Sequence, residues 1–244
     1  MLFRARRQKI PEAIILALGS GEVSVRLRQD PRARRYLLRL PADSTGPVLT
    51  IPRGGSLETA LDFATRNRGW LEGQLAARPA ATPFAAGADV PVRGKMHRIV
   101  ASGRLRGVVN AADGPDGPVL LVPGDESHIS RKVTDWLRKQ ARADLTAAVD
   151  RHSATIGRRA TAISLRDTRS RWGSCAANGR LSFSWRLILA PPEILDYVAA
   201  HEVAHLVEMN HSDRFWAVCR RLAPQTSTAR LWLREHGASL HMFG

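Results

Sequence analysis

Three histidines gathered within eleven residues constrain the fold of this 244-residue chain more than any other feature of its sequence. His201 and His205 stand four residues apart in the run His201-Glu202-Val203-Ala204-His205, and His211 follows six residues later. On an α-helix, two residues at this spacing lie on one face, one turn apart, so both imidazoles can reach a single metal ion at about 2.0–2.1 Å. The pattern therefore predicts a helix with a metal-binding face.

Glu202 belongs to the same pattern. It lies about 100° around the helix from His201, too far round to bind the ion in the same plane but close enough to reach a metal-bound water. Apolar residues cover the other faces and predict a centrally buried helix: Leu195, Ala199, Val203, Leu206 and Val207. A buried set of two histidines and a glutamate would be costly without a metal. We therefore expect Glu202 to be the general base of a metal site.

The position of His211 requires the helix to end. A continuous helix would carry His211 about 9 Å beyond His205 and onto a different face. Asn210 is a suitable C-terminal breaker, and Ser212 is a suitable N-cap for a second helix that runs to Leu222. His211 would then lie in the corner between two helices and turn back toward the ion.

Glu208 is the competing third ligand, because at i+3 from His205 it shares the metal-binding face. We favour His211 as the ligand and expect Glu208 to orient a histidine ligand without binding the metal itself. Three neutral imidazoles would leave the full charge on one zinc ion per chain, and a water in the open fourth position would have its pKa lowered toward ~7. Such a site is hydrolytic rather than structural.

The remaining patterns predict an α+β fold with a boundary near residue 128. Residues 1–128 form a β-rich N-terminal region with one helix, from Ser56 to before Pro79, and no assigned role. Residues 129–244 form the metal-binding domain, which begins with a helix from about Ser130 to Gly157. The expected strands are 23–28, 35–40, 48–51, 90–93, 97–101, 106–110, 119–122, 163–168, 169–175 and 181–185. No internal repeat is visible.

The amino-acid composition limits the kinds of binding partner and the cellular compartment that we expect for this chain. The net charge is +15, from 37 Lys and Arg against 22 Asp and Glu, and a field of this sign attracts anions. Nucleic acid is therefore an acceptable partner but not a required one. Cys175 and Cys219 form no metal or disulfide motif, which favours a reducing, cytoplasmic location. No run approaches the ~18 apolar residues of a spanning helix, so we expect no membrane partner.

Three motifs together carry a family resemblance. Arg171-Trp172-Gly173-Ser174-Cys175, then Ser184-Trp185-Arg186-Leu187, then the histidine pattern with Asn210-His211-Ser212, resemble the YgjP-like zinc metallopeptidases and metal-dependent hydrolases over roughly residues 130–225. This family is related to the SprT and WLM proteases. The resemblance implies a zincin-like catalytic domain, with the metal on His201, His205 and His211 and with Glu202 as catalytic acid and base.

Three further residues are candidates for contact with a substrate. Arg169 and Arg171 lie on the expected strand 169–175, and an arginine near zinc could stabilise an oxyanion or hold an anionic substrate. Tyr197 lies one turn before His201 on the same face and could also donate to an oxyanion. Solvated arginines and a tyrosine packed in the core are the alternatives.

The sequence thus predicts a zinc-dependent hydrolase, and a metallopeptidase is the favoured form. Its zinc-bound water would be activated by Glu202, and its substrate would be a peptide or protein, or else an anionic small molecule. One alternative is a hydrolase of a non-peptide bond, such as a nucleotide phosphoanhydride. A second is a nucleic-acid-associated, SprT-like protease in which the N-terminal region binds the nucleic acid.

Overall fold

The structure is a computed structural model that describes residues 10–41, 46–77, 82–168 and 170–244. Its contacts divide the chain into two compact units, Met1–Ala80 and Ala81–Gly244. The division expected near residue 128 therefore falls inside the second unit. The reason is long-range packing, because the strands of residues 89–122 share one core with the helix that follows them.

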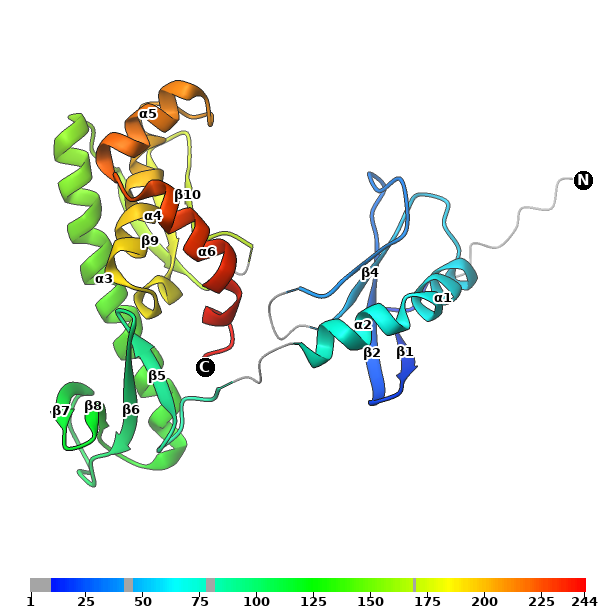
Figure 1. Cartoon of the computed structure of the whole chain (residues 1–244), viewed down its shortest axis with the longest axis horizontal. Helices are drawn as coiled ribbons and strands as arrows, with labels where there is room; N and C mark the ends of the chain where they lie inside the picture. Colours follow the sequence, from blue (N-terminus) through cyan, green and yellow to red (C-terminus); the bar gives the residue numbers. More distant parts are fainter. Residues whose placement is uncertain (1–9, 42–45, 78–81, 169) are drawn as a thin grey trace, which may run out of the picture. The chain divides into compact units, whose positions relative to one another are not determined.

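The first unit is a four-stranded sheet with two helices, which Figure 1 shows lying across the strands. The strands run in the order β1-β2-β4-β3. The bounds of its elements are β1 Ala13–Leu18, β2 Gly21–Gln29, β3 Leu37–Arg39, β4 Val48–Ile51, α1 Leu57–Arg66 and α2 Arg68–Ala76. Inward-facing side chains of the strands pack on Ala60, Ala64 and Leu71 of the helices to form a separate core.

The single helix expected after Ser56 is two helices in the structure. Ser56 caps α1 as predicted, since its hydroxyl accepts a hydrogen bond from Thr59 N at 3.1 Å. Asn67 interrupts the helix with φ −99° and ψ 11°, and its side-chain amide donates to the Phe63 carbonyl at 2.8 Å. This local bond ends α1 before α2 begins.

The second unit begins with a second four-stranded sheet, in the order β5-β6-β8-β7. Its strands are β5 Asp89–Val92, β6 Lys95–Ala101, β7 Asn110–Gly114 and β8 Gly117–Val122. The strand expected over residues 106–110 is absent, and β7 instead begins at Asn110 and pairs with β8 in a hairpin that turns between Gly114 and Gly117. The long helix α3, Ile129–Ile156, follows the short helix η1, Glu126–His128. It ends at Gly157, as predicted, in the left-handed conformation with φ 66°.

The two four-stranded sheets share one plan that the sequence did not reveal. In each, the two outer pairs are antiparallel and the central pair, β2–β4 or β6–β8, is parallel. A helical segment follows the last strand in both cases.

The remainder of the second unit carries the metal-binding pattern. A three-stranded sheet has the order β10-β11-β9, so that β10 is an edge strand beside the helices. The bounds are β9 Ala162–Arg166, β10 Gly173–Cys175, β11 Arg180–Ser184, η2 Trp185–Leu189, α4 Pro192–Ala204, α5 Asp213–Leu222 and α6 Thr226–Leu240. Helix α4 is buried along most of its length against α3, η2 and α6, as its apolar sequence predicts. The unit is therefore α+β, with the metal-binding helix at its centre.

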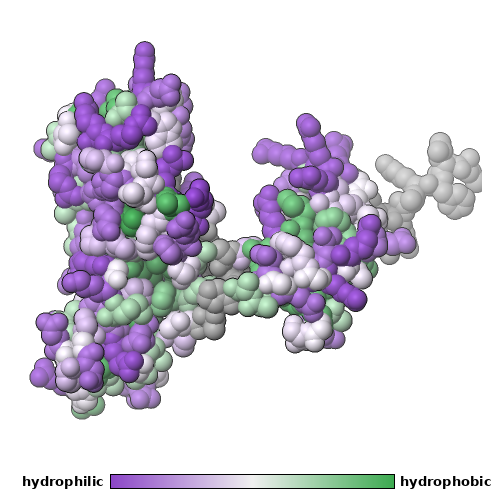
Figure 2. Space-filling model, in the orientation of Figure 1, coloured by the Kyte–Doolittle hydropathy of each residue, from purple (hydrophilic) through white to green (hydrophobic). Residues whose placement is uncertain are grey.

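The surface is mainly hydrophilic, as Figure 2 shows for the visible face of each unit. Among the described residues, no helix combines the length and the apolarity needed to cross a membrane.

Arg186 connects the C-terminal segment to the loop that precedes the site. The residue is 8% exposed, and its Nε donates to Asp167 Oδ1 at 2.8 Å. Its Nη1 donates to the Leu240 carbonyl at 3.3 Å and also to the carbonyl of Phe243. The guanidinium lies over the ring of Trp185, with Cζ 4.6 Å from the centroid. The buried guanidinium of Arg186 thus donates hydrogen bonds to one carboxylate and two main-chain carbonyl groups.

We expect Arg186→Gln to lower the free energy of unfolding of the second unit by about 2–3 kcal/mol, because it leaves these acceptors without a charged donor. Denaturant unfolding followed by circular dichroism measures the change. Arg131→Gln is the matched control, since its pair with Asp135 is exposed on both sides and should contribute only about 0–1 kcal/mol. Equal effects of the two substitutions would contradict this account of Arg186.

Candidate metal centre

The three histidines converge where α4 ends. Nε2 of His201 lies 3.1 Å from Nε2 of His211. Each of the three histidines offers one ring nitrogen, and these three nitrogens all lie within 4.8 Å of one another. Two nitrogens bound to one tetrahedral zinc at 2.0–2.1 Å would stand about 3.3 Å apart. The rings are thus arranged closely enough to hold a metal ion with little movement.

The turn that brings His211 back differs from the expected one. The prediction that α4 ends near Asn210 is wrong, because the helix ends at Ala204 with His205 as its C-cap. Leu206 N bonds to the Val203 carbonyl at 2.9 Å and Val207 N to the Ala204 carbonyl at 3.1 Å. Each of these bonds joins residues three apart rather than four, so the chain turns more tightly directly after α4. Ser212 caps α5 as predicted, accepting from Phe215 N at 3.5 Å.

His205 is held in one tautomer by the main chain of Glu208. Its Nδ1 lies 3.0 Å from the Glu208 carbonyl oxygen, which can only accept a hydrogen bond. Nδ1 therefore carries the proton, and Nε2 is left with a free lone pair for a metal. The carboxylate of Glu208 is outside the histidine cluster, so Glu208 acts on His205 through its carbonyl.

His201 is packed against Tyr197 and is held neutral. The Tyr197 hydroxyl lies 3.4 Å from Nδ1 of His201, the ring nitrogen that does not face His211. Burial, with the nearby charges of His205, His211 and Arg230, lowers the pKa of His201 to about 4. Burial likewise raises the pKa of Tyr197 to about 12. Neutral imidazole is the form that binds metals, so this environment favours a metal over a proton.

Glu202 is buried between α4 and the edge strand β10. A Cβ atom placed on Gly173 would lie 2.5 Å from Oε1 and 2.6 Å from Cγ of Glu202, which is closer than real Cβ atoms approach. Gly173 therefore leaves the space that the carboxylate occupies. Burial raises the pKa of Glu202 to about 7, and the positive charge of Arg171 acts against this rise. A carboxyl group in this state can both accept and release a proton near neutral pH.

Aromatic rings support the histidines from α5. Phe215 stacks on His205 with centroids 4.4 Å apart, and Trp216 stacks on His211 with centroids 5.7 Å apart. The guanidinium of Arg230, from α6, lies over Trp216 with Cζ 4.5 Å from the ring centroid. Two successive aromatic residues thus pack on two of the candidate ligands, and one of them, Trp216, also contacts an arginine.

The other expected contacts fall in different places. Arg171 is exposed and acts on Glu202, whereas Arg169 lies outside the described residues. The sequence analysis did not identify Gly173 and Arg230, which the structure places beside Glu202 and Trp216. A glycine inside a strand is itself a signal of close approach, so Gly173 could have been found, but nothing local marks Arg230 among so many arginines.

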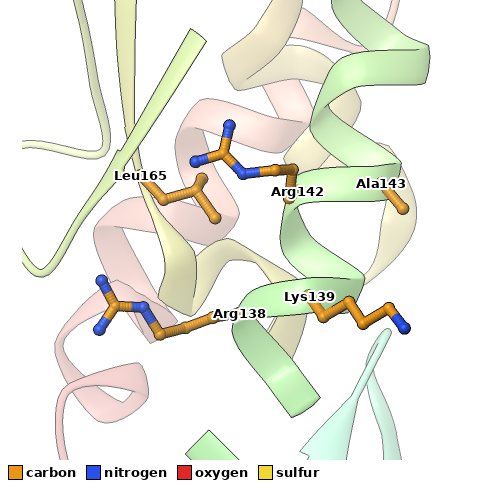
Figure 3. A pocket seen from close by; sticks show the side chains of 5 residues that line it. All are labelled: Arg138, Lys139, Arg142, Ala143 and Leu165. Atoms are coloured by element: carbon orange, nitrogen blue, oxygen red, sulfur yellow. The ribbon is translucent and has the colours of Figure 1, made fainter. Parts of the chain in front are cut away.

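A basic hollow lies on α3 and β9, on another part of the same unit. Arg138, Lys139, Arg142, Ala143 and Leu165 line it, and its volume is about 460 Å³. Figure 3 shows the side chains of Arg138 and Arg142 beside Leu165, with Lys139 pointing away from them. Arg142 also donates to the Ile163 carbonyl of the β9 edge at 3.1 Å. None of the candidate metal ligands lines this hollow.

Comparison with known proteins agrees with the geometry. No curated protein matches the chain. Among solved structures, the crystal structure of the metallopeptidase zymogen of Pyrococcus abyssi abylysin is 16% identical; the match covers 37% of this chain and 93% of that chain, with a TM-score of 0.34. A family model described as YgjP-like, metallopeptidase domain, matches residues 34–236, a range that includes the three histidines and Glu202. The chain therefore belongs to the YgjP-like metallopeptidase domain family.

Proposed function

We propose that this chain is a zinc-dependent peptidase, with zinc on His201, His205 and His211 and with Glu202 as general acid and base. The convergence of three imidazoles beside a buried carboxylate carries the proposal. The cluster contains no thiolate and no carboxylate ligand among the described residues, and three nitrogen ligands with an open fourth position are typical of catalytic zinc.

Different residues of the chain contribute to different parts of the proposed hydrolysis. When bound, zinc supplies a Lewis acid that polarises the scissile carbonyl and makes water acidic enough to attack at neutral pH. Glu202 takes the proton from the attacking water and passes it to the leaving amine. The Glu208 carbonyl and the Tyr197 hydroxyl keep His205 and His201 turned toward the ion.

The edge strand β10 fits a role in substrate binding. Among the described strands it pairs with β11 alone, and Gly173 brings it against Glu202. An extended peptide could add to this edge by main-chain hydrogen bonds, which would place its carbonyl groups near the carboxylate. This arrangement supports a peptide or protein as the substrate.

We expect the full chain to bind one zinc ion and the His211→Ala variant to bind it far more weakly. Loss of a ligand removes a coordinate bond, so the affinity should fall by much more than the ~10–100-fold typical of a lost supporting contact. Glu208→Ala is the control, because it retains the carbonyl that holds His205. Competition with a chelator measures both affinities. A larger loss in Glu208→Ala than in His211→Ala would show that Glu208 is the third ligand.

Glu202→Gln should retain zinc while losing turnover of peptides by about 10²–10⁴-fold, because the amide cannot take or give the proton. Peptide hydrolysis and elemental analysis are measured on the same sample. Activity within about threefold of the unmodified chain would reject Glu202 as the acid and base.

Gly173→Ala tests the contact between β10 and the carboxylate without altering any charged group. The added methyl must displace Glu202, so we expect turnover to fall by at least about 10-fold while zinc stays bound. Gly69→Ala in α2 is the matched control, since a Cβ there meets nothing within 4 Å. Unchanged turnover in Gly173→Ala would mean that the position of Glu202 is not set by this strand.

A further inference from the structure

Arg230 is a cation fixed beside the histidine cluster that the proposed reaction does not use. It lies in α6, and its guanidinium covers Trp216 with Cζ 4.5 Å from the ring centroid. The centroid of Trp216 is in turn 5.9 Å from that of His201 and 5.7 Å from that of His211. One indole ring therefore separates Arg230 from two of the three candidate ligands.

Both the indole and the helix under Arg230 are held in place. Trp216 packs edge-to-face on Phe215, which is fully buried. Further along α6, Gly237 gives the Trp172 ring room to approach, and the same ring stacks on His241 with centroids 4.9 Å apart. The guanidinium is thus presented from a supported surface, which lowers the entropy lost when it binds a ligand.

The charge of Arg230 has no ion-pair partner among the residues that the structure describes, and the residue is exposed. It is nevertheless near enough to act electrostatically on His201 and Tyr197. Arg171 adds a second positive charge near Glu202. A bound divalent metal would add more, so the surroundings of the site attract an anion.

The stacked guanidinium suits a carboxylate in particular. Its Cζ lies 4.5 Å from the indole centroid, and among the described residues its N–H groups donate no hydrogen bond, so they stay available. Two parallel N–H donors match the two oxygens of a carboxylate, and such pairs are among the stronger hydrogen bonds in proteins.

We propose that Arg230 binds a carboxylate side chain of the peptide substrate and so gives the enzyme a preference for acidic peptides. This rests on the proposed peptidase function. An extended peptide advances about 3.3 Å per residue, so a carboxylate within about two residues of the scissile bond can span the distance across Trp216. Arg230 is then a specificity-determining residue that contacts substrate away from the reacting atoms.

The test is a panel of peptides that differ in one residue. A single Glu, or Gln in the matched peptide, occupies each position near the scissile bond in turn, and kcat and KM are measured with the zinc-loaded full chain. We expect one Glu peptide to be favoured in kcat/KM by about 10- to 100-fold, mainly through KM, as for a hydrogen bond to a charged group. Arg230→Gln should abolish the preference, and Arg230→Lys should retain part of it.

Arg221→Gln is the control, because it removes one exposed positive charge from α5 and because Arg221 makes no cation–π contact with the described part of the chain. It should keep the preference for Glu. An equal preference for Glu in Arg230→Gln and in the unmodified chain would overturn the proposal. So would an equal loss in Arg221→Gln, which would attribute the preference to net charge.

Binding separates failure of this inference from failure of the peptidase function. The Glu202→Gln chain, loaded with zinc, is titrated with the same peptides in a calorimeter, with and without Arg230→Gln. Tighter binding of the Glu peptide that depends on Arg230 supports the inference. Hydrolysis of the peptides without any effect of charge rejects the inference alone, whereas neither hydrolysis nor binding of any peptide rejects both.

Discussion

The abrupt end of α4 after Ala204 is the constraint on which the metal centre depends. A longer helix would have carried His211 away along its axis. Because α4 ends at Ala204, the chain turns back and places Nε2 of His211 3.1 Å from Nε2 of His201. The bond from His205 to the Glu208 carbonyl serves two purposes, because it holds this turn and also fixes which nitrogen faces the site. The turn and the ligand set are therefore one structural feature.

Local signals in the sequence predicted much of this arrangement. The spacing of His201 and His205, the cap at Ser212 and the stop at Gly157 each depend on residues within one or two turns, and the structure contains the corresponding helices and caps. The predicted end of α4 was wrong because the hydrogen bond between the His205 ring and the Glu208 carbonyl lies at the end of the helix, whereas the expected breaker, Asn210, lies beyond it. The contacts of Gly173 with Glu202 and of Arg230 with Trp216 join separate elements, so their partners cannot be read from the local sequence, although a glycine within a strand does signal a close approach. The division of the chain after residue 80 was missed for the same reason, since only packing on α3 assigns β5–β8 to the second unit.

Burial and charge act together at the centre. Burial favours uncharged forms, and it leaves His201 neutral while it raises the pKa of Glu202. Ligands without charge leave a bound metal with its full positive charge, which is the condition for strong activation of water. Arg171 and Arg230 are exposed, so water still solvates their charges.

The dependence of the site on α6 also has a consequence for the order of events during synthesis. Arg186 and Trp172 take their partners from residues 237–243, and Arg230 also belongs to α6. A ribosome makes all of these residues after the helix that carries His201 and Glu202. The nascent chain can therefore form its sheets and the metal-binding helix early, but Trp216 and Trp172 lack their contacts with α6 until that helix has emerged and docked. We therefore expect the surroundings of the histidine cluster to be complete only after α6 has been made.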